Sequence, residues 1–123
     1  MRVLGLMSGT SMDGLDCCIS NIDIDKNYNF NYEILDYKTF PFNSKLKKMI
    51  CLSLGNAQKN IVHLCNEELG YFFLEKAKIF LNSKKVDLIS IHGQTISHVD
   101  KVESIQIGNP KYLYNYFKVP VCF

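Results

Sequence analysis

The stretch Leu6-Met7-Ser8-Gly9-Thr10-Ser11-Met12-Asp13-Gly14-Leu15-Asp16 lies between two apolar runs and contains two glycines, three hydroxyl groups and two carboxylates. This pattern predicts a strand, a tight turn and a second strand. The glycines allow backbone angles that other residues resist, so successive N–H groups can point into one concavity, with the hydroxyls as further donors. The aspartates would repel a phosphate unless a hard cation such as Mg²⁺ lay between them. We therefore predict that the turn holds nucleotide phosphates.

Three other interpretations of this turn differ in their support. A glycine- and serine-rich turn between strands is often an ordinary hairpin, and composition leaves that alternative open. The tetrad Gly9-Thr10-Ser11-Met12 matches the start of the signature of subtilisin-like proteases. Those enzymes carry their Asp and His earlier in the chain, and the residues before Ser11 include neither. A Walker A loop is excluded because no Gly-Lys-Ser or Gly-Lys-Thr follows.

Length and charge exclude further classes. A chain of 123 residues forms one domain at most, with a modest core. Its 14 basic and 12 acidic residues give a net charge of +2, too weak a field to indicate a nucleic-acid partner. The one dense basic cluster, at Lys45, Lys47 and Lys48, is predicted to be a solvated helix face.

The cysteines and the N-terminus predict where the protein resides. The five cysteines are an odd number and include no Cys-x-x-Cys pair, so neither a disulfide framework nor a zinc site is indicated. The sequence shows no basic segment followed by a long apolar stretch, and no run approaches about 18 apolar residues. We therefore expect a cytoplasmic protein with reduced thiols and no membrane partner.

The rest of the chain predicts alternating strands and helices. Strands are expected at residues 3–7, 15–20, 32–40, 86–91, 102–107 and 119–123, with a polar loop at residues 23–29. Helices are expected at residues 44–54, capped by Ser44, at residues 57–81 and at residues 110–117. In the long helix, apolar residues recur at three- and four-residue steps: Val62, Cys65, Leu69, Phe73, Ala77 and Phe80.

The strand at residues 86–91 follows a long helix, which implies a parallel crossover. In such sheets ligands bind beyond the carboxyl ends of the strands, and His92, Gly93, Gln94 and Thr95 occupy that position. Amide and hydroxyl side chains can pair with polar groups of a ligand, while Gly93 is expected to permit close approach. The segment is therefore a candidate ligand-binding site.

Three motifs carry a resemblance to a known family. The string Gly5-Leu6-Met7-Ser8-Gly9-Thr10-Ser11-Met12-Asp13-Gly14-Leu15-Asp16 resembles the N-terminal signature of the anhydro-N-acetylmuramic acid kinases. Further matches lie in Ser90-Ile91-His92-Gly93-Gln94-Thr95-Ile96-Ser97-His98 and in Gln106-Ile107-Gly108-Asn109-Pro110. The three motifs stand in the family's order and spacing, and together they extend over nearly the whole chain. Asn109 departs from the aspartate expected there, which puts a charged role at that position in doubt.

The resemblance implies an α/β fold with a ribonuclease-H-like mixed sheet in the order β-β-β-α-α-β-hairpin-α-β. Residues 1–123 would then be the N-terminal lobe of an actin-like two-domain kinase, with the C-terminal lobe absent from this chain. The apolar ending at Phe123 resembles an interior strand, and the family's catalytic aspartate is expected beyond it.

The implied reaction is ATP-dependent phosphorylation of 1,6-anhydro-N-acetylmuramic acid with hydrolytic opening of the anhydro ring, giving N-acetylmuramic acid 6-phosphate for cell-wall recycling. The implied ATP-binding residues are Gly9, Thr10, Ser11, Met12, Asp13, Gly14, Leu15 and Asp16. Asp13 or Asp16 is expected to act on Mg²⁺ through water. The candidate sugar-binding residues are His92, Gly93, Gln94, Thr95 and, more weakly, Gln106. The expected partners are these small molecules, and a homodimer is left open.

Two alternatives accompany this hypothesis. The chain could be a truncated or excised nucleotide-binding domain without catalytic activity of its own. It could also be a ribonuclease-H-like nuclease, but such an enzyme needs several clustered carboxylates for two metal ions. Only Asp13 and Asp16 lie close to the first strands.

Overall fold

The computed structural model describes residues 1–56 and 58–123. These residues form β1 (Arg2–Met7), β2 (Gly14–Ile24), β3 (Phe30–Pro41), α1 (Ser44–Ser53), η1 (Leu54–Asn56), α2 (Lys59–Leu81), β4 (Leu88–His92), β5 (Gln94–Val99), β6 (Glu103–Ile107), α3 (Lys111–Phe117) and β7 (Val121–Cys122). The predicted order of strands and helices is confirmed. Ala57, the expected first residue of the long helix, lies outside the described residues.

The main sheet is mixed and has five strands in the order β3-β2-β1-β4-β7. The first three strands form an antiparallel meander, while β4 runs parallel to β1 and β7 runs parallel to β4. Strands β5 and β6 form a separate antiparallel hairpin. The predicted mixed α/β fold with a parallel crossover is therefore confirmed.

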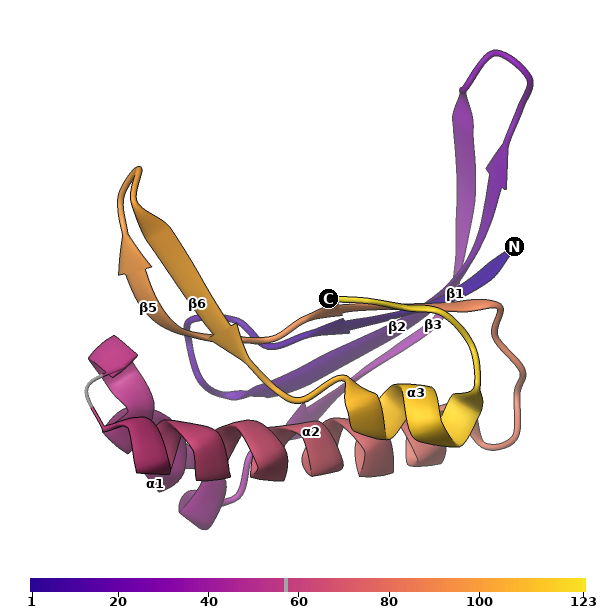
Figure 1. Cartoon of the computed structure of the whole chain (residues 1–123). Helices are drawn as coiled ribbons and strands as arrows, with labels where there is room; N and C mark the ends of the chain where they lie inside the picture. The colour runs from indigo at the N-terminus through magenta and orange to yellow at the C-terminus, as the bar shows by residue number, and fades with distance from the viewer. Residues whose placement is uncertain (57) are drawn as a thin grey trace.

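All three α-helices lie on one side of the sheet (Figure 1). The core lies between the sheet and the helices. Alternate residues of the strands point toward the helices, as Leu4, Leu6 and Ile19 do. The apolar stripe of α2 packs against them, with Cys65, Leu69, Phe73, Ala77 and Phe80 buried. The opposite face of the sheet is bordered by two hairpins that rise away from it, β2–β3 and β5–β6 (Figure 1).

The β2–β3 hairpin is longer than predicted. Asp23 and Ile24 still belong to β2 and pair with Asn31 and Phe30 of β3, so the loop shrinks to residues 25–29. The prediction was wrong because this loop is closed by its own polar side chains. The Asp25 carboxylate accepts hydrogen bonds from the backbone N–H of Asn27 and Asn29, at 2.7 and 2.9 Å.

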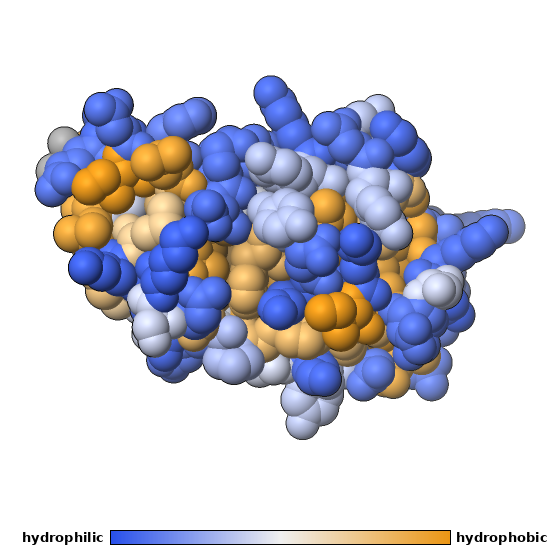
Figure 2. Space-filling model, turned by 90° about the horizontal axis from the view of Figure 1, so that it is seen from below, coloured by the Kyte–Doolittle hydropathy of each residue, from blue (hydrophilic) through white to orange (hydrophobic). Residues whose placement is uncertain are grey.

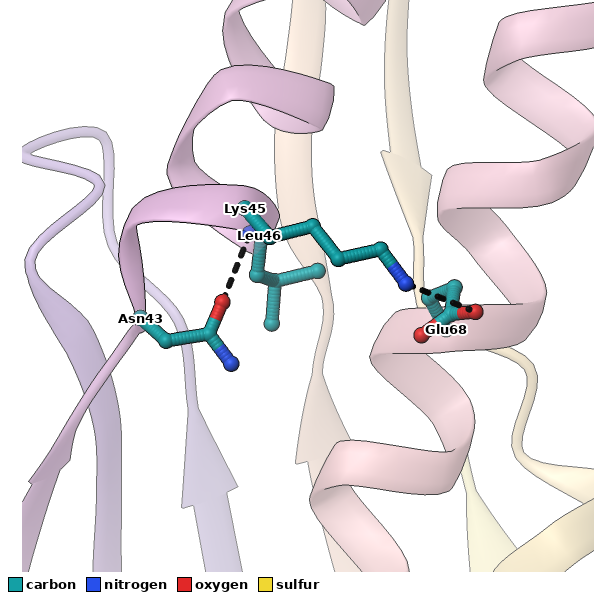
Figure 3. A network of polar contacts seen from close by, with 4 residues as sticks. All are labelled: Asn43, Lys45, Leu46 and Glu68. Atoms are coloured by element: carbon teal, nitrogen blue, oxygen red, sulfur yellow. Dashed lines mark hydrogen bonds and ion pairs between the residues drawn. The ribbon is translucent and has the colours of Figure 1, made fainter.

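The N-terminus of α1 also differs by one residue from the prediction. Asn43, not Ser44, caps the helix, and its Oδ1 accepts a hydrogen bond of 2.8 Å from the N–H of Leu46 (Figure 3). In the same first turn, Lys45 Nζ lies 3.7 Å from Glu68 Oε1 of α2 (Figure 3). Both side chains are largely exposed, so this ion pair contributes little to stability.

The helical side of the molecule is mostly hydrophilic, broken by hydrophobic patches (Figure 2). A hollow of about 360 Å³ lies there between α1 and α2 and contains no residue of the three motifs. No described helix is long and apolar enough to cross a membrane. All five cysteines are free thiols, as the sequence predicts.

Close packing joins α2 to the segment before α3. A Cβ on Gly70 would lie 2.5 Å from the backbone oxygen of Asn109, so only glycine fits there. Beside it, Asn66 Oδ1 accepts a bond of 2.8 Å from the N–H of Gly108, and Glu67 Oε1 accepts one of 2.8 Å from Asn109 Nδ2. Asn109 therefore has a structural role, because a carboxylate there would face Glu67.

Candidate functional site

The first two motifs meet at one edge of the main sheet. Strands β1 and β4 are parallel neighbours, and Met7 lies opposite His92 at their carboxyl ends. The N–H of Ser8 donates to the carbonyl of His92 at 3.1 Å, which continues the pairing one residue further. The β1–β2 turn (Ser8–Asp13) and the segment His92–Thr95 therefore leave the sheet side by side, as the crossover argument predicts.

The β1–β2 turn leaves backbone donors free. The N–H of Met12 donates to the carbonyl of Gly9 at 3.2 Å and closes the turn. Within the described part of the chain, no backbone or side-chain group accepts a hydrogen bond from the N–H of Gly9, Thr10 or Ser11. Thr10 and Ser11 are exposed, and their hydroxyls have no partner among the described residues. These groups together form a local concentration of hydrogen-bond donors suited to an anion.

The glycines of this turn serve a different purpose from the one predicted. Neither Gly9 nor Gly14 has a positive φ, whereas Met12 does, at 55°. A Cβ on Gly14 would lie 2.3 Å from the backbone oxygen of Phe40, while one on Gly9 would meet nothing closer than 3.9 Å. Gly14 is required for close strand packing, and Met12, partly buried against the core, takes the left-handed conformation.

Leu15, a member of the predicted ATP-binding set, has a core position. The side chain of Leu15 is fully buried, so only its backbone can face a ligand. The adjoining Cys17 is buried on the same side, and burial, followed by the negative charge of Asp16, raises the pKa of its thiol to about 12. Cys17 is therefore a core residue without nucleophilic character at neutral pH.

Asp13 and Asp16 are both exposed at the mouth of the turn. Asp16 Oδ1 accepts a hydrogen bond from Thr39 Oγ1 of β3, which lies opposite it in the strand register. Asp16 also lines a hollow of about 520 Å³ on the uncovered face of the sheet, together with Met7 and His92. One or two carboxylates suffice for Mg²⁺ when phosphates and water complete its shell, so this donor set fits the predicted ion. Among the described residues, no three His, Cys, Asp or Glu side chains cluster as a metal site.

His92 and Gln106 form a polar pair across the top of β4 and β6. Gln106 Nε2 and His92 Nε2 are 2.9 Å apart. The two side chains are close enough to share a hydrogen bond, with the roles of the imidazole nitrogen set by its tautomer. Thr95 lies opposite Gln106 in the β5–β6 register, which brings three of the five predicted sugar-binding residues to one place.

Gly93 and Gln94 are placed differently from the expectation that they face a sugar. A Cβ on Gly93 would lie 2.5 Å from the backbone oxygen of Ile107 and 3.0 Å from the ring of Phe123, so protein packing explains this glycine. Gln94 is 0% exposed. Its Oε1 accepts from Ser8 Oγ at 2.6 Å, and its Nε2 donates to the carbonyls of Gly9 and Thr95, both at 3.1 Å. The side chain is buried, and both its donors and its oxygen are engaged inside the protein, so it does not face a sugar.

Sequence reasoning assigned the wrong role to Ser8 and missed Thr39, and both residues support the site. Ser8 was expected to donate to a ligand, but its hydroxyl is buried against Gln94. Thr39 gave no signal of its own. It could have been found only by pairing β2 and β3 residue by residue. The bulge after Ile19 shifts the register of the two strands, so a count from the hairpin loop does not pair Thr39 with Asp16.

Comparisons with known proteins agree with the motifs. A model of the family described as anhydro-N-acetylmuramic acid kinase matches residues 1–122. A relative named anhydro-N-acetylmuramic acid kinase from Bacillus cereus is 33% identical over 123 residues, covering 89% of this chain and 32% of the relative. Another of the same name, from Caldanaerobacter subterraneus subsp. tengcongensis, is 34% identical over 124 residues, covering 88% of this chain and 31% of the relative.

A solved structure described as Thermus thermophilus RuvC is similar over 98% of this chain and 61% of that one, with a TM-score of 0.44 and 11% identity. The chain spans about a third of the length of the curated relatives that it matches. Since the family model covers all but the last residue, the chain belongs to the anhydro-N-acetylmuramic acid kinase family.

Proposed function

We propose that this chain is the N-terminal, ribonuclease-H-like lobe of a kinase. The kinase phosphorylates 1,6-anhydro-N-acetylmuramic acid with ATP and opens its anhydro ring with water, giving N-acetylmuramic acid 6-phosphate for cell-wall recycling. The observation that carries the proposal is the set of free donors on Gly9, Thr10 and Ser11, located next to His92 in a chain of this family. The catalytic base is expected in the part of the protein that follows Phe123.

In this proposal the β1–β2 turn binds the phosphates. The backbone N–H groups and hydroxyls of residues 9–11 donate to phosphate oxygens, each contributing about 1.5–3 kcal/mol to a charged acceptor. Asp13 and Asp16 would hold Mg²⁺ through water, and the bound ion would supply neutralisation of the phosphate charge. These carboxylates and amides act mainly by positioning, which is the main requirement of phosphoryl transfer.

The sugar lies, in this proposal, against His92, Thr95 and Gln106. Their side chains lie at the end of β4 and on the β5–β6 hairpin, beside the hollow that Asp16 also lines. Such a position would bring the sugar oxygen that receives the phosphoryl group near the end of the triphosphate. The free thiols and the sugar substrate support a cytoplasmic location. Homodimer formation remains a prediction that gel filtration would test.

The experiment measures phosphosugar formation by the full-length protein that carries these residues. Asp13→Asn should lower turnover at least tenfold, because it removes a carboxylate from the Mg²⁺ site. The matched control is Asp23→Asn, which removes a carboxylate from the opposite end of β2 and should leave turnover unchanged. Normal turnover by Asp13→Asn would refute the assignment of this residue.

Titration calorimetry with Mg-ATP separates the kinase from its main alternative. A kinase binds Mg-ATP and forms the phosphosugar. A nucleotide-binding domain without catalytic activity would bind Mg-ATP and form no product. A protein that does neither would refute both hypotheses.

A further inference from the structure

Gln94 connects the two motifs of the site from the inside of the molecule. It is the first residue of β5, yet its side chain reaches the start of the β1–β2 turn, 85 residues earlier. Both N–H donors of the amide are used, by the carbonyls of Gly9 and Thr95, and its oxygen accepts from Ser8 Oγ. A fully buried amide with both donors and its oxygen engaged holds its neighbours in one arrangement.

The carbonyl of Gly9 is the important partner. It accepts from Gln94 Nε2 at 3.1 Å and from the N–H of Met12 at 3.2 Å, so both of its lone pairs are engaged. This carbonyl therefore points toward the protein interior, where Gln94 lies. In a planar trans peptide the C=O and the next N–H point in opposite directions. The N–H of Thr10 consequently points away from the interior, toward the open side of the turn.

We propose that Gln94 is a positioning residue that orients the Gly9–Thr10 peptide so that the Thr10 N–H faces the nucleotide phosphates. The inference rests on the proposed function, because it assigns the phosphates to this turn. It changes the role of Gln94 from a sugar ligand to a support of the ATP site. Ser8 has the second part in this arrangement, since its hydroxyl fixes the orientation of the amide.

The identity of the residue supports this role. Glutamate in the same place would present carboxylate oxygens to the carbonyls of Gly9 and Thr95, which also accept hydrogen bonds. Asparagine is one methylene shorter and would withdraw the amide from the Gly9 carbonyl. Among these three side chains, glutamine alone supplies one acceptor and two donors at this length.

The test compares Gln94→Met with the wild type in the full-length protein. Methionine keeps nearly the same length and removes both donors, so the Gly9–Thr10 peptide loses its anchor. We expect the KM for ATP to rise about tenfold, with a much smaller change in the KM for the sugar. Hydrogen exchange of the Met12 amide should accelerate, because that amide shares the Gly9 carbonyl with Gln94.

Ser8→Ala provides the second variant if Gln94→Met does not fold. It keeps the bond from Gln94 Nε2 to the Gly9 carbonyl and removes only the Ser8 hydroxyl that donates to Gln94 Oε1. The KM for ATP and the exchange of the Met12 amide should therefore rise by less than in Gln94→Met. Its matched control is Ser53→Ala. Ser53 is also 0% exposed, and its hydroxyl donates to the carbonyl of Met49 at 2.8 Å, outside the three motifs. The control should lower stability without changing either KM or the exchange of Met12.

The KM values and the hydrogen exchange of the Met12 amide keep this inference separate from the proposed function. A rise confined to the KM for the sugar, with unchanged Met12 exchange, would overturn the positioning role and restore Gln94 as a sugar ligand. If the wild type neither binds Mg-ATP nor forms product, the proposed function fails. Met12 exchange still decides whether Gln94 orients the turn.

Discussion

The two turns of the β1–β2–β3 meander use their hydrogen-bond donors in opposite ways. In the β2–β3 turn (Asp25–Asn29), the Asp25 carboxylate accepts from the backbone N–H of Asn27 and Asn29 and from Asn29 Nδ2. The N–H of Tyr28 donates to the Asp25 carbonyl at 3.0 Å. The N–H of Asp25 in turn donates to the Asn29 carbonyl at 3.1 Å, so among the described backbone N–H groups of this turn only that of Lys26 has no acceptor.

In the β1–β2 turn, the Ser8 hydroxyl and the Gly9 carbonyl are bonded to the protein interior, while backbone N–H donors stay free. Ser8, Gly9 and Met12 are held by Gln94, by His92 and by each other. The N–H groups of Gly9, Thr10 and Ser11 have no acceptor among the described residues. Both turns are rich in polar residues, so composition does not distinguish a binding turn from a closed one. The distinction lies in whether side chains of the turn itself accept from its amides.

The largest expected effect contrasts the closely packed start of β2, at Gly14, with the unobstructed position of the Gly9 Cα in the β1–β2 turn. Gly14→Ala should lower the free energy of unfolding by about 3 kcal/mol, since its Cβ would lie 2.3 Å from a backbone oxygen of a paired strand. Gly9→Ala should change stability by no more than about 0.5 kcal/mol, because its Cβ would enter open space. Denaturant unfolding measures both. Equal losses would show that the middle of the turn is packed after all.

The next prediction compares the two turns as ligand sites. Ser11→Ala should weaken Mg-ATP binding about tenfold, the effect of losing one hydrogen bond of about 1.5 kcal/mol to a charged acceptor. Asn27→Ala removes a polar side chain of similar exposure from the β2–β3 turn and should leave affinity unchanged. Titration calorimetry of the full-length protein measures the difference. Equal affinity in the two variants would remove the distinction between the turns.

Much of the fold was predictable because it depends on local patterns. The period of α2 and the alternation in β2 follow from neighbouring residues, and the strands and helices that were given ranges lie within a few positions of the observed ones. The strand β5 was predicted only as part of a hairpin, without a range. The errors concern side-chain caps. Asn43 sets the start of α1 and Asp25 sets the length of the β2–β3 loop, because each side chain accepts backbone hydrogen bonds. The spacing of apolar residues does not predict such bonds.

The site was predictable in outline only. The meeting of the β1–β2 turn with His92 follows from the parallel crossover, which the sequence indicates. The burial of Gln94 against Ser8 depends on a contact between residues 86 positions apart. Both side chains have donors and acceptors that can serve either a ligand or the protein itself. A polar residue in a motif therefore shows that a position matters, and the three-dimensional contacts decide whether it binds a ligand or holds the residue that does.

The smallest predicted effect tests the closed turn by pH. Hydrogen bonds from the side chain and then the backbone of Asn29 lower the pKa of Asp25 below its ordinary 3.8. A lowered folded-state pKa stabilises the protein above the unfolded value, and the contribution is lost as the pH falls below 3.8 through the folded pKa. Hydrogen bonds from Asn109 and Tyr112 lower the pKa of Glu67, so its contribution to stability is also lost as the pH falls below its ordinary pKa of 4.5.

The measurement therefore uses Glu67→Gln as the background and follows Tm from pH 5 to acid values. Adding Asp25→Ala should lower Tm slightly at pH 5 and reduce the further fall of Tm between pH 5 and acid values. The affinity for Mg-ATP at neutral pH should stay unchanged. An unchanged acid dependence would show that the Asp25 carboxylate does not hold the β2–β3 turn. Weaker nucleotide binding would show instead that the two turns are coupled through β2, so that the closed turn supports the open one.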